Sequence, residues 1–313
     1  MILVTGGSGY VGSHVVRRLA ESGEQVRALV RDPRRVERER RLEGIPVEIV
    51  AADVTVPDSL PAAFDGVRSV IHTVAIAIEK EGRTYEQVNY QGTANVVHAA
   101  ESAGVRRFIN LSQLGADSTL PYRFLASKGR AQAVVAGSEM EWTAFRPSVI
   151  WGPEDEFANT FARLIPFSPL IYPIVGDASS KFEPIWVEDI VTCMVKVLSD
   201  PSTYGCEYEL GGPEVLTLEE IERRTLSAVG ATRAMVRFPM PLLRVIVALM
   251  ETLLPAPPVT RSLLELLAVS NVTAENSLAQ FVSDPRPFVP EYTANYMAHF
   301  RAGTTLAQFF GRS

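Results

Sequence analysis

The glycine-rich segment near the start of the chain constrains the fold more than any other feature. An apolar run at residues 2–5 leads into TGGSGYVG, and an amphipathic helix is predicted over residues 10–22. Gly6, Gly9 and Gly12 have the spacing G-x-x-G-x-x-G. In a strand–turn–helix unit, the first glycine permits a tight turn, the second permits close approach of a pyrophosphate, and the third permits close helix–strand packing. The pattern therefore predicts a dinucleotide site at a helix N terminus.

Strands and helices alternate through the first half of the chain. Further strands are predicted at residues 25–30, 47–53, 67–72, 105–112 and 142–150. Alternation at this spacing indicates right-handed crossovers and a parallel sheet, whose ligands lie outside the carboxyl ends of the strands. We predict an α/β fold: a Rossmann-type doubly wound parallel sheet with a smaller, mostly helical C-terminal lobe.

The predicted domain boundary follows the last of these strands. Residues 1–150 are assigned to a dinucleotide-binding Rossmann domain, with returns to it near 182–212. Residues 151–313 are assigned to a C-terminal lobe for a substrate or partner, because the alternation ends there and proline becomes frequent.

Composition excludes several classes of protein. The 313-residue chain has a net charge of −6 and no dominant basic face, so no nucleic-acid partner is expected. Cys193 and Cys206 are predicted to be reduced thiols, and no metal site is predicted. The N terminus is interpreted as the first strand rather than a signal peptide, and no transmembrane helix is expected. The predicted location is cytoplasmic, with peripheral contact at the inner face of a membrane as an alternative.

Several motifs together resemble the extended and atypical short-chain dehydrogenase/reductases. After the glycine turn, these are AADVTVPDSL, VIHTVAI, VNYQGTANVVHAA and FRPSVIWGPEDEF, in the family's order. The resemblance implies NADP(H) or NAD(H) as cofactor. It places Asp53 and Val54 beside the adenine, and Pro147, Ser148 and Val149 beside the nicotinamide amide. The full implied set of cofactor contacts outside the second strand is Gly6, Ser8, Gly9, Tyr10, Val11, Gly12, Asp53, Val54, Thr73, Val74, Ala75, Asn89, Lys128, Pro147, Ser148 and Val149.

The end of the second strand favours NADP(H). An NAD-specific site has an acidic residue there to bind the ribose 2′-hydroxyl, whereas this chain has Arg31. A guanidinium suits a 2′-phosphate. Asp32 is the competing candidate, one residue late for the ribose, and NAD(H) remains an alternative cofactor.

The catalytic positions depart from the family pattern. A reductase of this family needs a tyrosine four residues before its lysine, on the same helix face. Lys128 fits the lysine, but Phe124 stands at the tyrosine position and Tyr122 lies six residues before Lys128. If the helix begins at Pro121, Phe124 faces Lys128 and Tyr122 points elsewhere. Tyr122 could reach Lys128 only if a bulge or a later helix start re-aims its side chain.

A hydroxyl that could orient substrate is also ambiguous. Ser112 ends the fifth strand, but the family's hydroxyl could align with Gln113 instead. Ser112 is as well explained as a cofactor contact or a loop cap. His72, at the end of the fourth strand, is interpreted as a packing residue rather than a general base.

A narrower resemblance is carried by NLSQLGAD, RPSVIWGPEDEFANTFARL and PPVTRSLLELLAVSNVT. These segments resemble bacterial homologues of the NADPH-binding accessory subunit of mitochondrial complex I, whose wider relatives include NmrA-like sensors. This resemblance implies a structural or sensory cofactor, and an accessory or assembly role in a respiratory or redox complex. The alternative is an active NAD(P)-dependent reductase or epimerase acting on a small carbonyl, quinone or nucleotide sugar, with a small-molecule or quinone-like ligand in the cleft between the lobes.

Residues 235–260 are the predicted partner region. Arg237, Arg244 and Glu251 recur every seven residues, so a continuous helix would carry them as one charged stripe on an apolar cylinder. Such a helix is usually buried between lobes. The alternative is a surface for a protein complex partner, a membrane or a quinone.

Overall fold

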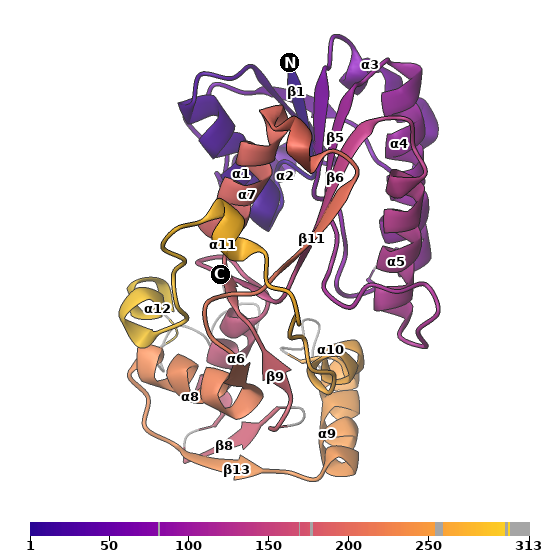
Figure 1. The fold of residues 1–313 in the computed structure, drawn as a ribbon. Coiled ribbons are helices and arrows are strands. Elements are labelled where there is room, and N and C mark those ends of the chain that lie inside the picture. Colours follow the sequence, from indigo (N-terminus) through magenta and orange to yellow (C-terminus); the bar gives the residue numbers. More distant parts are fainter. Residues whose placement is uncertain (81, 169, 176–177, 254–258, 298–299, 301–313) are drawn as a thin grey trace. The chain divides into compact units, whose positions relative to one another are not determined.

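The computed structural model describes the whole chain except residues 81, 169, 176–177, 254–258, 298–299 and 301–313 (Figure 1). The chain forms two compact units. The first unit comprises Met1–Pro147, Val187–Leu210 and Glu275–Asp284. The second unit comprises Ser148–Trp186, Gly211–Ala274 and the described residues from Pro285 onward.

The first unit is built on a seven-stranded sheet in the order β11-β6-β5-β4-β1-β2-β3, in which every pairing is parallel. Its strands are β1 (Ile2–Thr5), β2 (Val26–Val30), β3 (Glu48–Ala51), β4 (Ser69–His72), β5 (Arg107–Leu111), β6 (Glu141–Pro147) and β11 (Cys206–Leu210). The predicted Rossmann-type fold class is confirmed. The order places the carboxyl ends of β1, β2, β3 and β4 along one stretch of the sheet edge, where a ligand is expected.

Helices cover both faces of this sheet. Its helices are α1 (Tyr10–Glu21), α2 (Pro33–Glu39), α3 (Pro61–Phe64), α4 (Gly92–Ser102), α5 (Arg123–Ala136), α7 (Val187–Lys196) and α11 (Leu278–Phe281). In Figure 1, α1 and α7 lie on one face, and α4 and α5 on the other. One turn of π-helix, Glu86–Gln91, leads directly into α4. Two 3-10 helices at Val197–Ser199 and Pro201–Thr203 precede β11, and a third, Pro57–Ser59, follows β3.

The glycine turn sets the position of α1. Gly6 has φ +72°, a left-handed conformation that glycine adopts without strain. Gly9 N donates to Gly6 O at 2.8 Å, which closes the turn. A Cβ on Gly12 would overlap Gly6 O, so only glycine allows the first turn of α1 to come this close. The helix then buries an apolar side that includes Val15 and Leu19, as its sequence predicts.

The second unit combines short two-stranded sheets with five α-helices among its described residues. Its helices are α6 (Ala158–Leu164), α8 (Leu218–Val229), α9 (Met240–Leu253), α10 (Arg261–Leu267) and α12 (Pro290–Met297), with a 3-10 helix at Ile165–Phe167. Three two-stranded sheets pair β7 (Ile150–Trp151) with β10 (Ile185–Trp186), β9 (Lys181–Phe182) with β12 (Leu216–Thr217), and β8 (Ile171–Ile174) with β13 (Ala234–Arg237). Its core combines aliphatic side chains with aromatic ones, of which Trp151, Phe161 and Phe288 are almost fully buried.

Three details of the sequence interpretation are corrected. The predicted strand 142–150 is two strands, because β6 ends at Pro147 and β7 pairs with β10 in the second unit. The helix that carries Lys128 begins at Arg123, with Tyr122 as its N-cap, rather than at Pro121. Arg237 lies in β13 before α9, so it shares no helical stripe with residues of α9.

The partner region 235–260 is described only in part, since residues 254–258 lie outside the described residues. Among the helices that the structure describes, none combines the length and the apolar character needed to span a membrane.

Candidate cofactor site

A pocket of about 230 Å³ opens at the carboxyl ends of β1, β2, β3 and β4 in the first unit. It is lined by Gly6, Ser8, Gly9, Leu29, Val30, Arg31, Asp32, Ala52, Asp53, Val54, Thr73, Val74, Ala75, Ile76, Arg83 and Val88. Most of the cofactor contacts implied by the sequence outside α1 and α5 therefore surround one hollow. Tyr10, Val11 and Gly12, which were also implied, form the first turn of α1 beside it.

The start of α1 fits a pyrophosphate. Within the described residues, no side chain caps this helix, and its first turn carries no acidic residue. A helix N terminus of this kind presents backbone N–H groups and a partial positive charge to an anion. A side chain at position 12 would collide with the backbone of Gly6, so this turn requires a glycine there. The same requirement is typical of nucleotide-binding turns.

The end of β2 presents one cation and one acid to the pocket. Arg31 directly follows β2 and is exposed at the pocket wall. Asp32 is the N-cap of α2, and its carboxylate accepts a hydrogen bond from Arg34 N at 3.0 Å. The carboxylate of Asp32 therefore serves as a helix cap, whereas Arg31 lies at the pocket wall.

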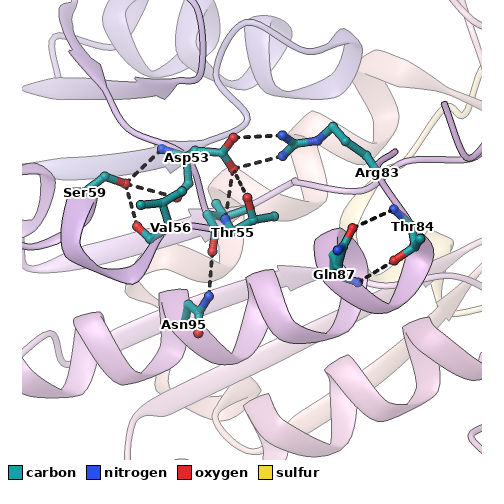
Figure 2. A network of polar contacts seen from close by, with 9 residues as sticks. Asp53, Thr55, Val56, Ser59, Arg83, Thr84, Gln87 and Asn95 are labelled. Atoms are coloured by element: carbon teal, nitrogen blue, oxygen red, sulfur yellow. Dashed lines mark hydrogen bonds and ion pairs between the residues drawn. The ribbon is translucent and has the colours of Figure 1, made fainter. Parts of the chain in front are cut away.

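The end of β3 holds an ion pair that the sequence interpretation did not include. Asp53 binds both terminal nitrogens of Arg83 at 2.9 Å (Figure 2). This guanidinium is the largest cause that holds the pKa of Asp53 well below its usual range. Arg83 directly precedes Thr84. Thr84 and Gln87 form a T-x-x-Q capping pattern, which is a sequence signal for the start of a helix. That signal could have located the turn before the helix, but it could not have identified Asp53, which follows β3, as the partner of Arg83.

The last residue of β4, His72, links this strand to its neighbours through two side-chain hydrogen bonds. His72 is buried; its Nδ1 lies 2.7 Å from Thr5 Oγ1 and its Nε2 lies 2.9 Å from Thr93 Oγ1. The Thr93 hydroxyl already donates to Asn89 O, so His72 donates from Nε2 and accepts at Nδ1. Burial lowers the pKa of His72 to about 3, and Lys128 adds a smaller effect in the same direction. The ring is therefore a neutral link between β1 and α4.

Asn89 holds the loop beyond β4 rather than lining the pocket. Its Oδ1 accepts from Ile76 N at 2.8 Å, and its Nδ2 donates to Ile76 O and to Ser127 Oγ. The same side chain thus ties a pocket residue, Ile76, to α5.

Lys128 lies on the buried side of α5. Its Nζ donates to Leu111 O at 2.7 Å, at the carboxyl end of β5. Burial lowers the pKa of Lys128 to about 8. Ser112, the next residue after β5, is also buried, and its Oγ has no hydrogen-bond partner among the described residues. A lysine and an unsatisfied hydroxyl therefore occupy the same strand end.

Phe124, not Tyr122, shares a helix face with Lys128. Both lie in the regular part of α5 four residues apart, whereas Tyr122 is the N-cap with an extended backbone. The Phe124 ring packs edge-on against Tyr85, with ring centroids 5.6 Å apart. In the described part of the chain, Lys128 makes its one side-chain hydrogen bond with Leu111. The helix geometry thus provides no phenol one turn before the lysine.

The three residues implied at the nicotinamide amide fall on both sides of the unit boundary. Pro147 ends β6, and its carbonyl accepts from Leu114 N. Ser148 belongs to the second unit, where its hydroxyl donates to Asn271 O at 2.7 Å and accepts from Glu183 N at 3.2 Å. Val149 O accepts from Ile185 N in the same unit. The Ser148 side chain thus has structural partners of its own.

Comparison with known proteins places this site in a family. A family model described as NAD(P)H-binding matches residues 6–162, which include the glycine turn, the pocket and Lys128. The chain belongs to this NAD(P)H-binding family. It is a member of the atypical short-chain dehydrogenase/reductase superfamily, and its cofactor class is a nicotinamide dinucleotide.

The individual relatives are named for different activities. The chain is 29% identical over 249 residues to NADH dehydrogenase [ubiquinone] 1 alpha subcomplex subunit 9 of Arabidopsis thaliana, covering 78% of this chain and 62% of that protein. It is 30% identical to the NAD(P)H azoreductase of Xenophilus azovorans, covering 74% of each. The solved UDP-glucuronic acid 4-epimerase of Bacillus cereus, in complex with NAD, shares its fold with a TM-score of 0.72 at 15% identity, covering 95% of this chain and 99% of that one.

The neutral state of His72 predicts a pH dependence. Above pH 6.5 the ring is neutral in both folded and unfolded chains. As the pH falls from 6.5 toward 3, only the unfolded chain takes up the proton, so stability falls. We expect His72→Gln to remove about 2 kcal/mol of the loss between pH 6.5 and pH 5, measured by urea unfolding. His98→Gln, at an exposed position of α4, is the control. Parallel pH profiles for wild type and His72→Gln would contradict the assignment.

Proposed function

We propose that this protein binds NADP(H) in preference to NAD(H) and holds it in a structural or sensory role. The observation that carries the proposal is Phe124, which lies one helical turn before Lys128 on α5. The pocket at the strand ends, lined by Gly6, Arg31 and Asp53, supports cofactor binding. Without a phenol, proton transfer to a substrate oxygen lacks its usual donor. The lysine is then left with a binding role, toward the hydroxyl groups of the nicotinamide ribose.

Similarity to the Arabidopsis complex I subunit supports an accessory or assembly role in a respiratory or redox complex. The chain spans 62% of that relative's length, so any shared partner is part of this proposal. In such a role a tightly held nucleotide would stabilise the fold or report the redox state, and turnover would be unnecessary.

An active reductase is the second candidate, favoured by Lys128 and by similarity to an azoreductase. In that case Tyr122 or a water molecule supplies the proton, and the substrate is a small carbonyl, a quinone or a nucleotide sugar. A start of α5 at Arg123 leaves Tyr122 outside the regular helix, so a rearrangement of this N-cap would be needed.

We further propose that α9 contacts a lipid surface. Five aliphatic side chains on this helix are more than a third exposed, which is unusual for so short a segment: Leu242, Val245, Ile246, Leu249 and Leu253. The exposed set on α9 contains no aromatic residue, although aromatic anchors are typical of protein interfaces. Aliphatic side chains beside an exposed Arg244 suit the boundary between acyl chains and head groups.

Arg31 is expected to set the cofactor preference. By calorimetry, wild type should bind NADPH roughly 10- to 100-fold more tightly than NADH, since the guanidinium forms charge-assisted hydrogen bonds with the 2′-phosphate. Arg31→Asp should abolish or reverse this preference. Arg123→Ala, an exposed position on α5, is the control. Equal affinities of wild type for the two cofactors would refute the preference.

The missing phenol can be restored. With NADPH and a panel of quinones and carbonyls, wild type should oxidise the cofactor only at the background rate. Phe124→Tyr should raise the rate by at least about tenfold, because general acid catalysis typically contributes about 10²–10⁴-fold. Tyr122→Phe should change nothing, and Lys128→Ala should weaken NADPH binding. Fast turnover by wild type that Tyr122→Phe abolishes would establish the reductase instead.

Membrane contact is tested by flotation with vesicles of phosphatidylglycerol and phosphatidylethanolamine. Wild type should float with the vesicles, and Val245→Ser with Leu249→Ser should weaken binding at least about tenfold, because both side chains lose apolar area. Val215→Ser is the matched control, since Val215 is 52% exposed but lies outside α9. Equal flotation of the control and the double variant would rule out α9 as the contact.

A further inference from the structure

The turn that carries Arg83 is fixed on both sides of this residue. On one side, Arg83 N donates to Lys80 O at 2.9 Å, and Gly82 adopts φ +75°. On the other side, Thr84 and Gln87 exchange two hydrogen bonds of 3.2 Å, as Figure 2 shows. The backbone therefore delivers the guanidinium to the pocket wall in a set direction.

The ion pair that Arg83 makes with Asp53 is geometrically specific. The two terminal nitrogens of Arg83 bind the two carboxylate oxygens, each at 2.9 Å. The side chains are 25% and 21% exposed. A bidentate pair of this kind fixes the plane of the carboxylate as well as its position, which a single lysine donor cannot do.

The two oxygens of Asp53 are used unequally. Oδ1 accepts from Thr55 N at 2.9 Å and Thr55 Oγ1 at 2.8 Å, in addition to Arg83. Within the described residues, Oδ2 accepts from Arg83 alone. Each carboxylate oxygen can accept about two hydrogen bonds, so Oδ2 has capacity for one more donor.

The neighbouring backbone is held as firmly as the side chain. Asn95 on α4 donates from Nδ2 to Val54 O at 2.8 Å, and Ser59 Oγ lies 3.1 Å from both Asp53 N and Asp53 O (Figure 2). Asp53, Val54 and Arg83 all line the pocket. A rigid acceptor therefore stands in the wall where the family resemblance puts the adenine.

We propose that Arg83 is a positioning residue for recognition of the cofactor's base: it orients Asp53 so that Oδ2 accepts a hydrogen bond from the exocyclic amine of adenine. The proposal rests on the proposed function only in requiring that a nicotinamide dinucleotide binds in this pocket. It extends that function from the 2′-phosphate, assigned to Arg31, to the base.

The chemistry of the base makes this recognition measurable. Adenine carries an amine, a donor, where hypoxanthine carries a carbonyl oxygen, an acceptor. Against Oδ2 the amine forms a charge-assisted hydrogen bond, whereas the carbonyl oxygen leaves two acceptors facing each other. If Arg83 orients Asp53, its replacement should change the ratio of the affinities for the two bases. A general loss of cofactor affinity would leave that ratio unchanged.

The experiment is calorimetry of the full chain with NADPH and with its hypoxanthine analogue. Wild type should bind NADPH roughly 10- to 100-fold more tightly than the analogue. Arg83→Gln should reduce this ratio to within about threefold, because the carboxylate is no longer held in one plane. Arg83→Lys should keep an intermediate ratio. Asp53→Asn should also lose discrimination, since an amide can turn either its oxygen or its nitrogen to the base.

Arg130→Gln is the matched control, because Arg130 also pairs with an acidic side chain, Glu86, but lies outside the pocket lining. Thermal unfolding of each variant identifies any that fail to fold, and the ratio between bases is insensitive to a general loss of affinity. A base ratio in Arg83→Gln equal to that of wild type, or no discrimination by wild type, would overturn the proposal. If NADPH and NADH bind equally, the preference assigned to Arg31 fails, and the base ratio is still measurable with NADH and its hypoxanthine analogue.

Discussion

The structure of the first unit depends on one steric constraint, the absence of a side chain at Gly12. Because nothing separates the first turn of α1 from Gly6 O, the helix N terminus lies directly at the carboxyl end of β1. Thr73, which follows β4, also contacts the carboxyl end of β1, since its hydroxyl donates to Thr5 O at 2.8 Å. The pocket is the space that these close contacts leave between neighbouring strand ends.

Charge in this pocket is arranged to accept a polyanion. A bare carboxylate in the wall would repel the phosphates of a dinucleotide, but Asp53 is compensated by Arg83 at 2.9 Å. Arg31 then adds a cation at the wall, and the end of α1 contributes its partial positive charge. His72 lies nearby but stays neutral because it is buried. The carboxylate at the end of β3 is thus compensated, and the wall keeps the positive charge of Arg31.

Local signals predicted the sheet and the glycine turn, whereas long-range pairings escaped prediction. Strand β1 is buried on both faces and appears in the sequence as a short apolar run before the glycine turn, so its place and type could be inferred. The Asp53–Arg83 pair joins residues 30 positions apart, and no local pattern specifies it. Arg237 was misplaced for a related reason: pairing with β8 makes its segment a strand, and a seven-residue repeat cannot reveal that pairing.

The energetics of Lys128 connect the fold to the proposed role. A drop in its pKa to about 8 means that burying this ammonium costs about 3 kcal/mol relative to water. In a reductase, the buried ammonium would lower the pKa of a neighbouring phenol, but Phe124 occupies the matching position and packs against Tyr85. One bond to Leu111 O leaves the ammonium with further donors, and Ser112 adds a buried hydroxyl without a partner among the described residues. Polar groups buried with spare hydrogen-bonding capacity are stabilised when a polar ligand binds, so this strand end is compatible with the proposed binding role of Lys128.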